Sequence, residues 1–68
     1  MTVYEFMRKM GKDEKFFLKE HLTDITKGKP TSIDDVTYHY EEREDVLDAL
    51  EYNVLTVDMA EGTIYCER

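Results

Sequence analysis

The C-terminal segment constrains the fold more than any other part of the chain. Val54–Ala60 and Thr63–Glu67 are rich in β-branched and aromatic residues, and they flank Glu61-Gly62, a two-residue link suited to a tight turn. The sequence therefore predicts a β-hairpin with one buried face, which other elements must cover. The predicted register pairs Ala60 with Thr63, Met59 with Ile64 and Val57 with Cys66, and gathers on one face Leu55, Val57, Met59, Ile64 and Cys66.

The N-terminus has the clearest helix signals. Thr2 and Glu5 have the spacing of a capping box, in which each side chain accepts a hydrogen bond from the other residue's backbone amide. Apolar residues then recur at helical spacing, and Gly11 can supply the turn that ends the helix. The predicted apolar stripe comprises Val3, Phe6, Met7 and Met10.

Residues 14–27 have two competing interpretations. A helix capped by Asp13 would end near Gly28, because Gly28-Lys29-Pro30 follows. A strand over Phe16–Glu20 is the alternative, but the start of that run does not alternate strictly between apolar and polar residues. The helix is the favoured prediction, and its apolar face comprises Phe17 or Leu18, Leu22 and Ile25.

The middle of the chain predicts a loop, a strand and a third helix. Thr31–Asp35 is polar, although Ser32 could cap one short turn. Val36–Tyr40 is nearly all β-branched or aromatic and favours a strand. Glu42–Tyr52 has helical periodicity, with Asn53 as its C-terminal cap. The apolar face of this helix comprises Val46, Leu47 and Leu50.

These elements predict a single α+β domain spanning residues 1–68, in the order α-α-β-α-β-β. The simplest arrangement is a three-stranded antiparallel or mixed sheet with the helices packed on its apolar face. A chain of 68 residues buries only about 60% of the surface that it exposes when unfolded, which leaves little room for a deep substrate pocket.

The location expected from the sequence is the cytoplasm. Cys66 is the only cysteine, so no internal disulfide can form, and a reducing compartment fits. The first residues lack the basic and apolar regions of a signal peptide. No apolar run approaches the roughly 18 residues that a membrane span needs.

Charge is distributed very unevenly along the chain. Residues 1–30 carry seven Lys/Arg and five Asp/Glu, whereas residues 31–68 carry two Lys/Arg and eleven Asp/Glu. Between Asp34 and Glu51, eight carboxylates accompany a single cation, Arg43. Such a field governs which partners approach the protein and does not determine its fold.

The acidic run has a functional and a structural interpretation. On a continuous helix, carboxylates would recur once per turn, about 5.4 Å apart, and could occupy a Lys/Arg groove that otherwise binds nucleic acid. Alternatively, the row is a solvated face whose first carboxylates stabilise the helix N-terminus. The residues of the row are Glu41, Glu44 or Asp45, Asp48 and Glu51.

Tyrosines accompany the acidic half and suggest where a partner binds. Tyr38 and Tyr40 are expected to cover the edge of the core. Tyr65 falls on the polar face of the predicted hairpin and, with Tyr52 nearby in sequence, is the better candidate for an exposed contact, because tyrosine is enriched at interface hot spots. The predicted partner-binding residues are Glu44, Asp48, Glu51, Tyr52, Asp58 and Tyr65.

The sequence has no pattern typical of catalysis, metal binding or cofactor binding. His21, His39 and Cys66 are isolated and lack zinc-site spacing. Ser32 is the only serine and has no nucleophile-elbow setting, and the glycines form no phosphate loop. No enzyme activity, metal or cofactor is therefore expected.

The basic residues of the first half resemble a helix-turn-helix only in outline, and the acidic half would repel a duplex. We therefore expect no direct nucleic-acid binding and no membrane partner. This basic face could instead contact the acidic half of a second copy, giving a homodimer. The basic residues concerned are Arg8, Lys9, Lys12, Lys15 and Lys19.

The functional prediction is a small acidic protein-binding module with a basic protein partner. Its sharper form is an inhibitor or regulator whose acidic face mimics nucleic acid, by analogy with small accessory proteins of phages and mobile elements. The alternative is a self-associating structural or accessory domain whose acidic surface is only solvated.

Overall fold

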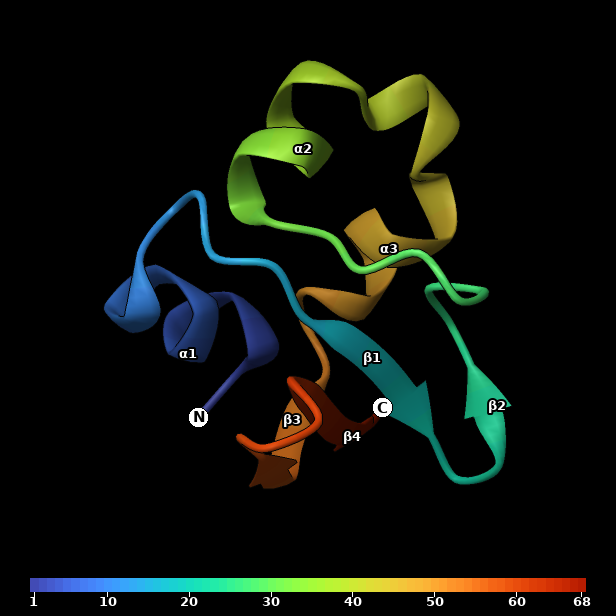
Figure 1. Ribbon diagram of the computed structural model, residues 1–68. Helices are drawn as coiled ribbons and strands as arrows, with labels where there is room; N and C mark the ends of the chain where they lie inside the picture. Colours follow the sequence, from blue (N-terminus) through green and yellow to red (C-terminus); the bar gives the residue numbers. More distant parts are fainter.

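The computed structural model describes residues 1–68 and has the α+β architecture expected from the sequence (Figure 1). It differs from the prediction in element order and in sheet size, because the second element is a pair of short strands and the predicted strand over Val36–Tyr40 is helical. The elements are α1 (Val3–Met10), β1 (Phe17–Glu20), β2 (Thr23–Asp24), α2 (Ile33–Tyr38), a 3₁₀ turn η1 (Tyr40–Glu42), α3 (Glu44–Ala49), β3 (Asn53–Asp58) and β4 (Thr63–Glu67).

The four strands form one mixed sheet in the order β2-β1-β4-β3. The central pair, β1 and β4, is parallel, with Leu18 opposite Ile64, while the outer pairs are antiparallel. Apolar side chains of the helices and of one face of the sheet form a single buried cluster, as predicted. The buried cluster comprises Val3, Met7, Phe16, Leu18, Ile33, Val36, Val46, Ala49, Leu50, Ile64 and Cys66.

The first helix confirms the capping-box prediction. The Thr2 amide donates to Glu5 Oε1 over 3.0 Å, and the Glu5 amide donates to Thr2 Oγ1 over 3.1 Å. Val3 and Met7 are fully buried, whereas Met10, the last residue of the predicted stripe, is exposed. Gly11 has φ +126° and ends the helix, with its amide donating to the Met7 carbonyl.

The predicted helix over residues 14–27 is wrong, and the alternative strand is correct. Leu18 is completely buried beside Ile64 of β4, while Leu22, placed on the same helical face by the prediction, is fully exposed. A turn with positive φ at His21 reverses the chain between β1 and β2. Pairing with a strand far along the chain therefore outweighs the local helical pattern.

The predicted strand over Val36–Tyr40 is also wrong. Ser32 does cap a helix, and it forms a complete capping box with Asp35, so the segment predicted as a loop starts α2. The inward residues of α2 are Ile33 and Val36, three positions apart, as a helix requires.

The third helix is shorter than predicted. It covers Glu44–Ala49, and Asn53 does not cap it but begins β3. The start of α1 docks on the end of α3: the Val3 amide donates to the Tyr52 carbonyl and the Tyr4 amide to the Leu50 carbonyl, each over 2.9 Å. These contacts satisfy two amides left free at the start of α1, and the Leu50 carbonyl at the C-cap of α3.

The C-terminal hairpin is confirmed, but its predicted register is wrong. Asp58 pairs with Thr63, and Val57 pairs with Ile64, so the loop has four residues, Met59–Gly62. The Asp58 carboxylate accepts a hydrogen bond from the Glu61 amide over 3.1 Å and thereby stabilises this longer loop.

An irregularity in β3 also changes which hairpin residues face inward. The register shifts between Val54 and Thr56, so Leu55 is bulged outward and 57% exposed, and Met59 in the loop is 56% exposed. Both were predicted on the buried face. Ile64 and Cys66, predicted on the same face, are buried.

Candidate partner-binding face

The acidic run folds into an arch of short helical elements above the sheet (Figure 1). We call residues Asp34–Glu51, which form α2, η1, α3 and their connections, the acidic cap. Two of its carboxylates, Asp34 and Asp35, are partly buried. The exposed carboxylates of the cap are Glu41, Glu42, Glu44, Asp45, Asp48 and Glu51.

The predicted row of carboxylates is not continuous. Arg43 separates η1 from α3, and α3 ends at Ala49, so only Glu44, Asp45 and Asp48 lie on one helix. Glu51 follows in a turn. The carboxylates therefore curve around the cap, and the once-per-turn spacing predicted for the whole run is wrong.

Two ion pairs link the basic half of the chain to the acidic cap. Lys15 Nζ lies 3.5 Å from Asp35 Oδ2, and Lys27 Nζ lies 3.3 Å from Asp45 Oδ2. Part of the charge asymmetry is thus compensated within the molecule, although exposed ion pairs stabilise a fold little. No ion pair involves the other cap carboxylates, Asp34, Glu41, Glu42, Glu44, Asp48 and Glu51.

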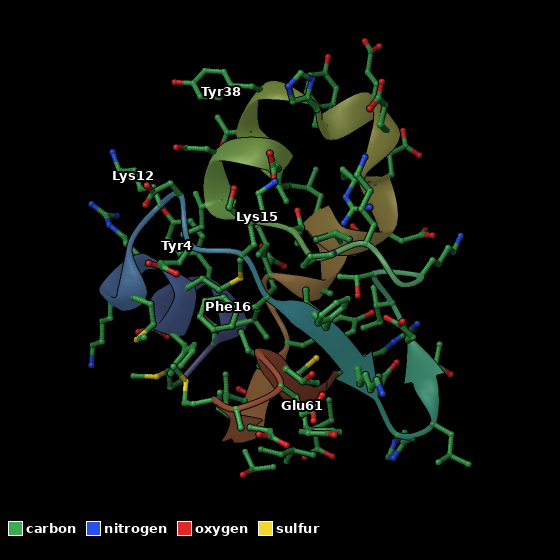
Figure 2. The ribbon with its side chains drawn as sticks, viewed as in Figure 1. Tyr4, Lys12, Lys15, Phe16, Tyr38 and Glu61 are labelled. Carbon is green, nitrogen blue, oxygen red and sulfur yellow. The ribbon has the colours of Figure 1, made fainter.

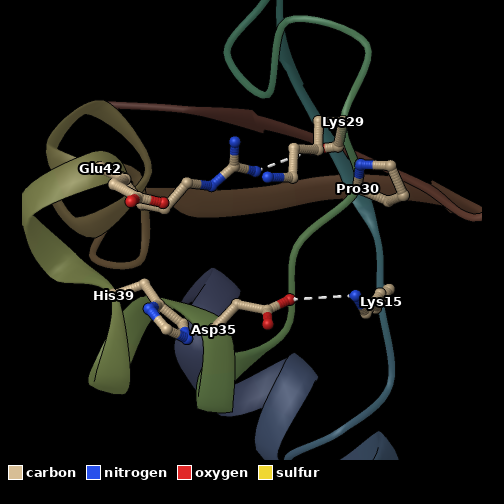
Figure 3. A pocket seen from close by; sticks show the side chains of 7 residues that line it. Lys15, Lys29, Pro30, Asp35, His39 and Glu42 are labelled. Carbon is tan, nitrogen blue, oxygen red and sulfur yellow. Dashed lines mark hydrogen bonds and ion pairs between the residues drawn. The ribbon is translucent and has the colours of Figure 1, made fainter.

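A polar cleft of about 290 Å³ lies between the cap and the loop that precedes it (Figure 3). The guanidinium of Arg43 donates to the Lys29 carbonyl over 2.7 Å, and Lys15 contacts Asp35. These cationic groups are therefore already engaged within the protein. The lining is mostly polar, and Pro30 is its one apolar side chain; the residues are Lys15, Lys29, Pro30, Asp35, His39, Glu42 and Arg43.

Asp35 connects the cap to the rest of the fold as a carboxylate. Burial alone would raise its pKa, but hydrogen bonding with Ser32 and the charge of Lys15 outweigh this effect and lower the pKa. Asp35 therefore remains ionised at neutral pH, which maintains both the capping box of α2 and the contact with Lys15.

The structure divides the predicted site residues between different places. Glu44, Asp48 and Glu51 are exposed on the cap. Tyr52 is partly buried, packs against the core and has the Arg68 guanidinium carbon 5.6 Å from its ring centroid.

The other two predicted residues belong to the hairpin. Asp58 stabilises the hairpin loop, as described above. Tyr65 on β4 lies opposite Lys19 of β1, on the face of the sheet away from Ile64 and Cys66. Of the predicted site residues, the structure brings Asp48 and Tyr52 together at one shallow hollow, whereas Asp58 and Tyr65 belong to the hairpin.

Two exposed tyrosines were assigned to the wrong environment. Tyr38 is 76% exposed and Tyr40 is 54% exposed, so neither covers the core edge. The signal that identifies them is the Ser32–Asp35 capping box, because a helix beginning there with Ile33 and Val36 inward places Tyr38 at its outer end.

Two further features bear on the chemistry available. No group of three His, Cys, Asp or Glu side chains is placed to hold a metal ion. The helix-turn-helix outline is absent, because Lys15 precedes β1 and Lys19 lies in it. What the cap offers is a set of exposed carboxylates that can contact positively charged groups.

Comparisons of the chain with protein-family models, with curated proteins and with solved structures give no match. None of the three helices has the length and apolar character needed to cross a bilayer.

Cys66 provides a test of the packing beneath this face. Burial, with a further contribution from the charge of Glu20, raises the pKa of its thiol to about 11. Alkylation of the native protein by iodoacetamide at pH 8 should be about a hundredfold slower than that of free cysteine, because the thiolate is the reactive form. Denaturant should restore a normal rate, and rapid labelling of the native protein would contradict this packing.

Proposed function

We propose that this protein is a non-enzymatic protein-binding module that presents its acidic cap to the basic surface of a partner. The observation that carries the proposal is the set of exposed cap carboxylates that have no ion pair within the molecule. The chain has a formal net charge of −7, and this local concentration of charge would steer a basic partner toward the cap.

The partner class that fits is a protein whose basic groove handles nucleic acid. Such grooves bind phosphates through Lys and Arg, and carboxylates can supply the same charge pairing. Because the carboxylates curve around the cap, the match would be in charge sign and extent, without the regular spacing of a phosphate backbone. The protein would then act as an inhibitor or regulator by occupying the groove.

The clefts on this face favour binding over catalysis. The cleft shown in Figure 3 has a mostly polar lining, and two of its cations, Lys15 and Arg43, contact a carboxylate and a backbone carbonyl respectively. Ligand pockets for small substrates are mostly apolar, with a few polar groups that converge on the ligand. At this cleft, the hydrogen bond from Arg43 to the Lys29 carbonyl instead joins the cap to the loop before it.

The alternative, a self-associating accessory domain, has less support from the sheet edges. Edge strand β2 has only two residues. On the outer side of β3, the Val54 amide donates to the Met1 carbonyl over 2.9 Å, and the bulge at Leu55 interrupts the edge. Short and bulged edge strands are the usual means by which proteins avoid edge-to-edge pairing.

A charge-neutralising variant tests the proposal. Changing Glu44→Gln, Asp48→Asn and Glu51→Gln together should weaken capture of the partner from a lysate of the source organism by at least about tenfold, because several charge pairs are lost. The captured partner would be identified by mass spectrometry. Duplex DNA or RNA should displace it from the wild-type protein, and so should high salt.

The matched control removes equal charge elsewhere. The substitutions Glu14→Gln, Glu61→Gln and Glu67→Gln affect exposed carboxylates outside the cap and should leave capture nearly unchanged. Equal losses in both triple variants would indicate that net charge alone attracts the partner. Capture that survives the cap substitutions and high salt would contradict the proposal.

A further inference from the structure

The outer end of the acidic cap combines exposed aromatic rings with carboxylates. Residues Tyr38–Glu42, which we call the tip, run from the end of α2 through η1. Figure 2 shows Tyr38 at the end of the molecule opposite Glu61 of the hairpin loop. With 76% and 54% of their surfaces exposed, the two tyrosines of the tip are not needed to cover the core.

The tip forms a shallow hollow of about 230 Å³, lined by Tyr38, His39, Tyr40, Glu41 and Glu42. Aromatic ring faces carry partial negative charge, and the two carboxylates carry full negative charges. The lining therefore suits a cation that has a flat, weakly hydrated surface. The nearest cation of the cap, Arg43, already donates to the Lys29 carbonyl and contributes no lining group here.

We propose that the tip receives an arginine side chain of the basic protein partner. A guanidinium can stack on a tyrosine ring and donate to carboxylates at the same time, because it is planar and presents several donors in its plane. A lysine ammonium is more strongly hydrated and has no flat face for stacking. This inference rests on the proposed function, since it assigns an anchor residue to the basic partner.

A titration with short peptides isolates the tip from the rest of the interface. The full-length protein, labelled with ¹⁵N, would be titrated with an acetylated and amidated peptide of arginine residues, and separately with the equivalent lysine peptide. The arginine peptide should bind more tightly and should shift the amide resonances of Tyr38–Glu42. Equal affinity for the two peptides, or shifts confined to α3, would overturn the inference.

Substitutions at the tip separate ring stacking from simple charge attraction. Tyr38→Leu with Tyr40→Leu should weaken arginine-peptide binding by about tenfold, whereas the double phenylalanine variant should remain within about twofold of wild type. Tyr4→Leu is the matched control, because Tyr4 lies on α1 and is 38% exposed. Far-UV circular dichroism would verify that each variant is folded.

The outcomes for the tip and for the proposed function are distinguishable. If the leucine variant binds the arginine peptide as tightly as wild type does, the tip is not an arginine site. The proposed function then still depends on the separate result for Glu44, Asp48 and Glu51. If those substitutions leave partner capture intact, the proposed function fails even where the tip binds arginine peptide.

Discussion

Replacing Leu18 by alanine is expected to lower the free energy of unfolding by about 3 kcal/mol, because its fully buried side chain leaves a cavity in the core. Leu18 lies on an inner strand, opposite Ile64 of β4. A domain of 68 residues has a total stability of only about 3–10 kcal/mol. The variant should therefore lose between about a third and all of its stability, as measured by urea denaturation with circular dichroism.

Leu22→Ala is the matched control for this experiment. Leu22 is fully exposed in the turn between β1 and β2, so its removal should change the free energy of unfolding by less than about 0.5 kcal/mol. A helix over residues 14–27 would place Leu18 and Leu22 on the same buried face, one turn apart. Comparable destabilisation by both substitutions would support that helix and contradict the strand.

The parts of the fold that the sequence predicts well are those with local causes. The capping box of Thr2 and Glu5 involves only residues within one helical turn, and the first helix has the predicted start. The β-branched and aromatic runs near the C-terminus likewise predict two strands joined by a short loop.

The errors have causes that lie outside the local sequence. Phe16-Phe17-Leu18 is compatible with either a helix or a strand, and the outcome depends on pairing with β4 at the other end of the chain. The hairpin register depends on the Asp58 side chain, which stabilises a four-residue loop, and on the bulge at Leu55. Neither effect follows from apolar alternation alone.

The charge of the acidic cap was predictable from the sequence, whereas the environment expected for its two tyrosines was wrong. Counting carboxylates locates the cap, but only the fold shows that Asp35 and Asp45 pair with lysines from the first half. The exposure of Tyr38 and Tyr40 was missed because their segment was predicted as a strand. Tyrosines assigned to the core edge are therefore available at the surface.

Asp24→Ala is expected to destabilise the protein by about 2 kcal/mol, because hydrogen bonds to a charged acceptor are lost. Asp24 Oδ1 accepts from the Thr26 amide over 3.0 Å and from the Thr26 hydroxyl over 2.6 Å, and Oδ2 accepts from the Gly28 amide over 2.8 Å. The Thr26 hydroxyl is buried and also accepts from the Leu18 amide over 3.3 Å. Asp24 therefore holds the loop after β2 against β1.

The pH dependence of this effect identifies the ionised carboxylate as its source. Hydrogen bonds from the Thr26 hydroxyl, with further ones from backbone amides of the loop, lower the pKa of Asp24 below its ordinary value of 3.8. The stabilisation is thus present above about pH 4 and is lost as the pH falls through the lowered pKa of the folded state. The difference in unfolding free energy between wild type and Asp24→Ala should shrink as the pH is lowered from 6 toward 2, measured by urea denaturation.

Asp13→Ala, at an exposed carboxylate, is the control and should differ from wild type in unfolding free energy by almost nothing at any pH. A difference for Asp24→Ala that stays constant to pH 2 would mean that the side chain acts through packing and not through its charge.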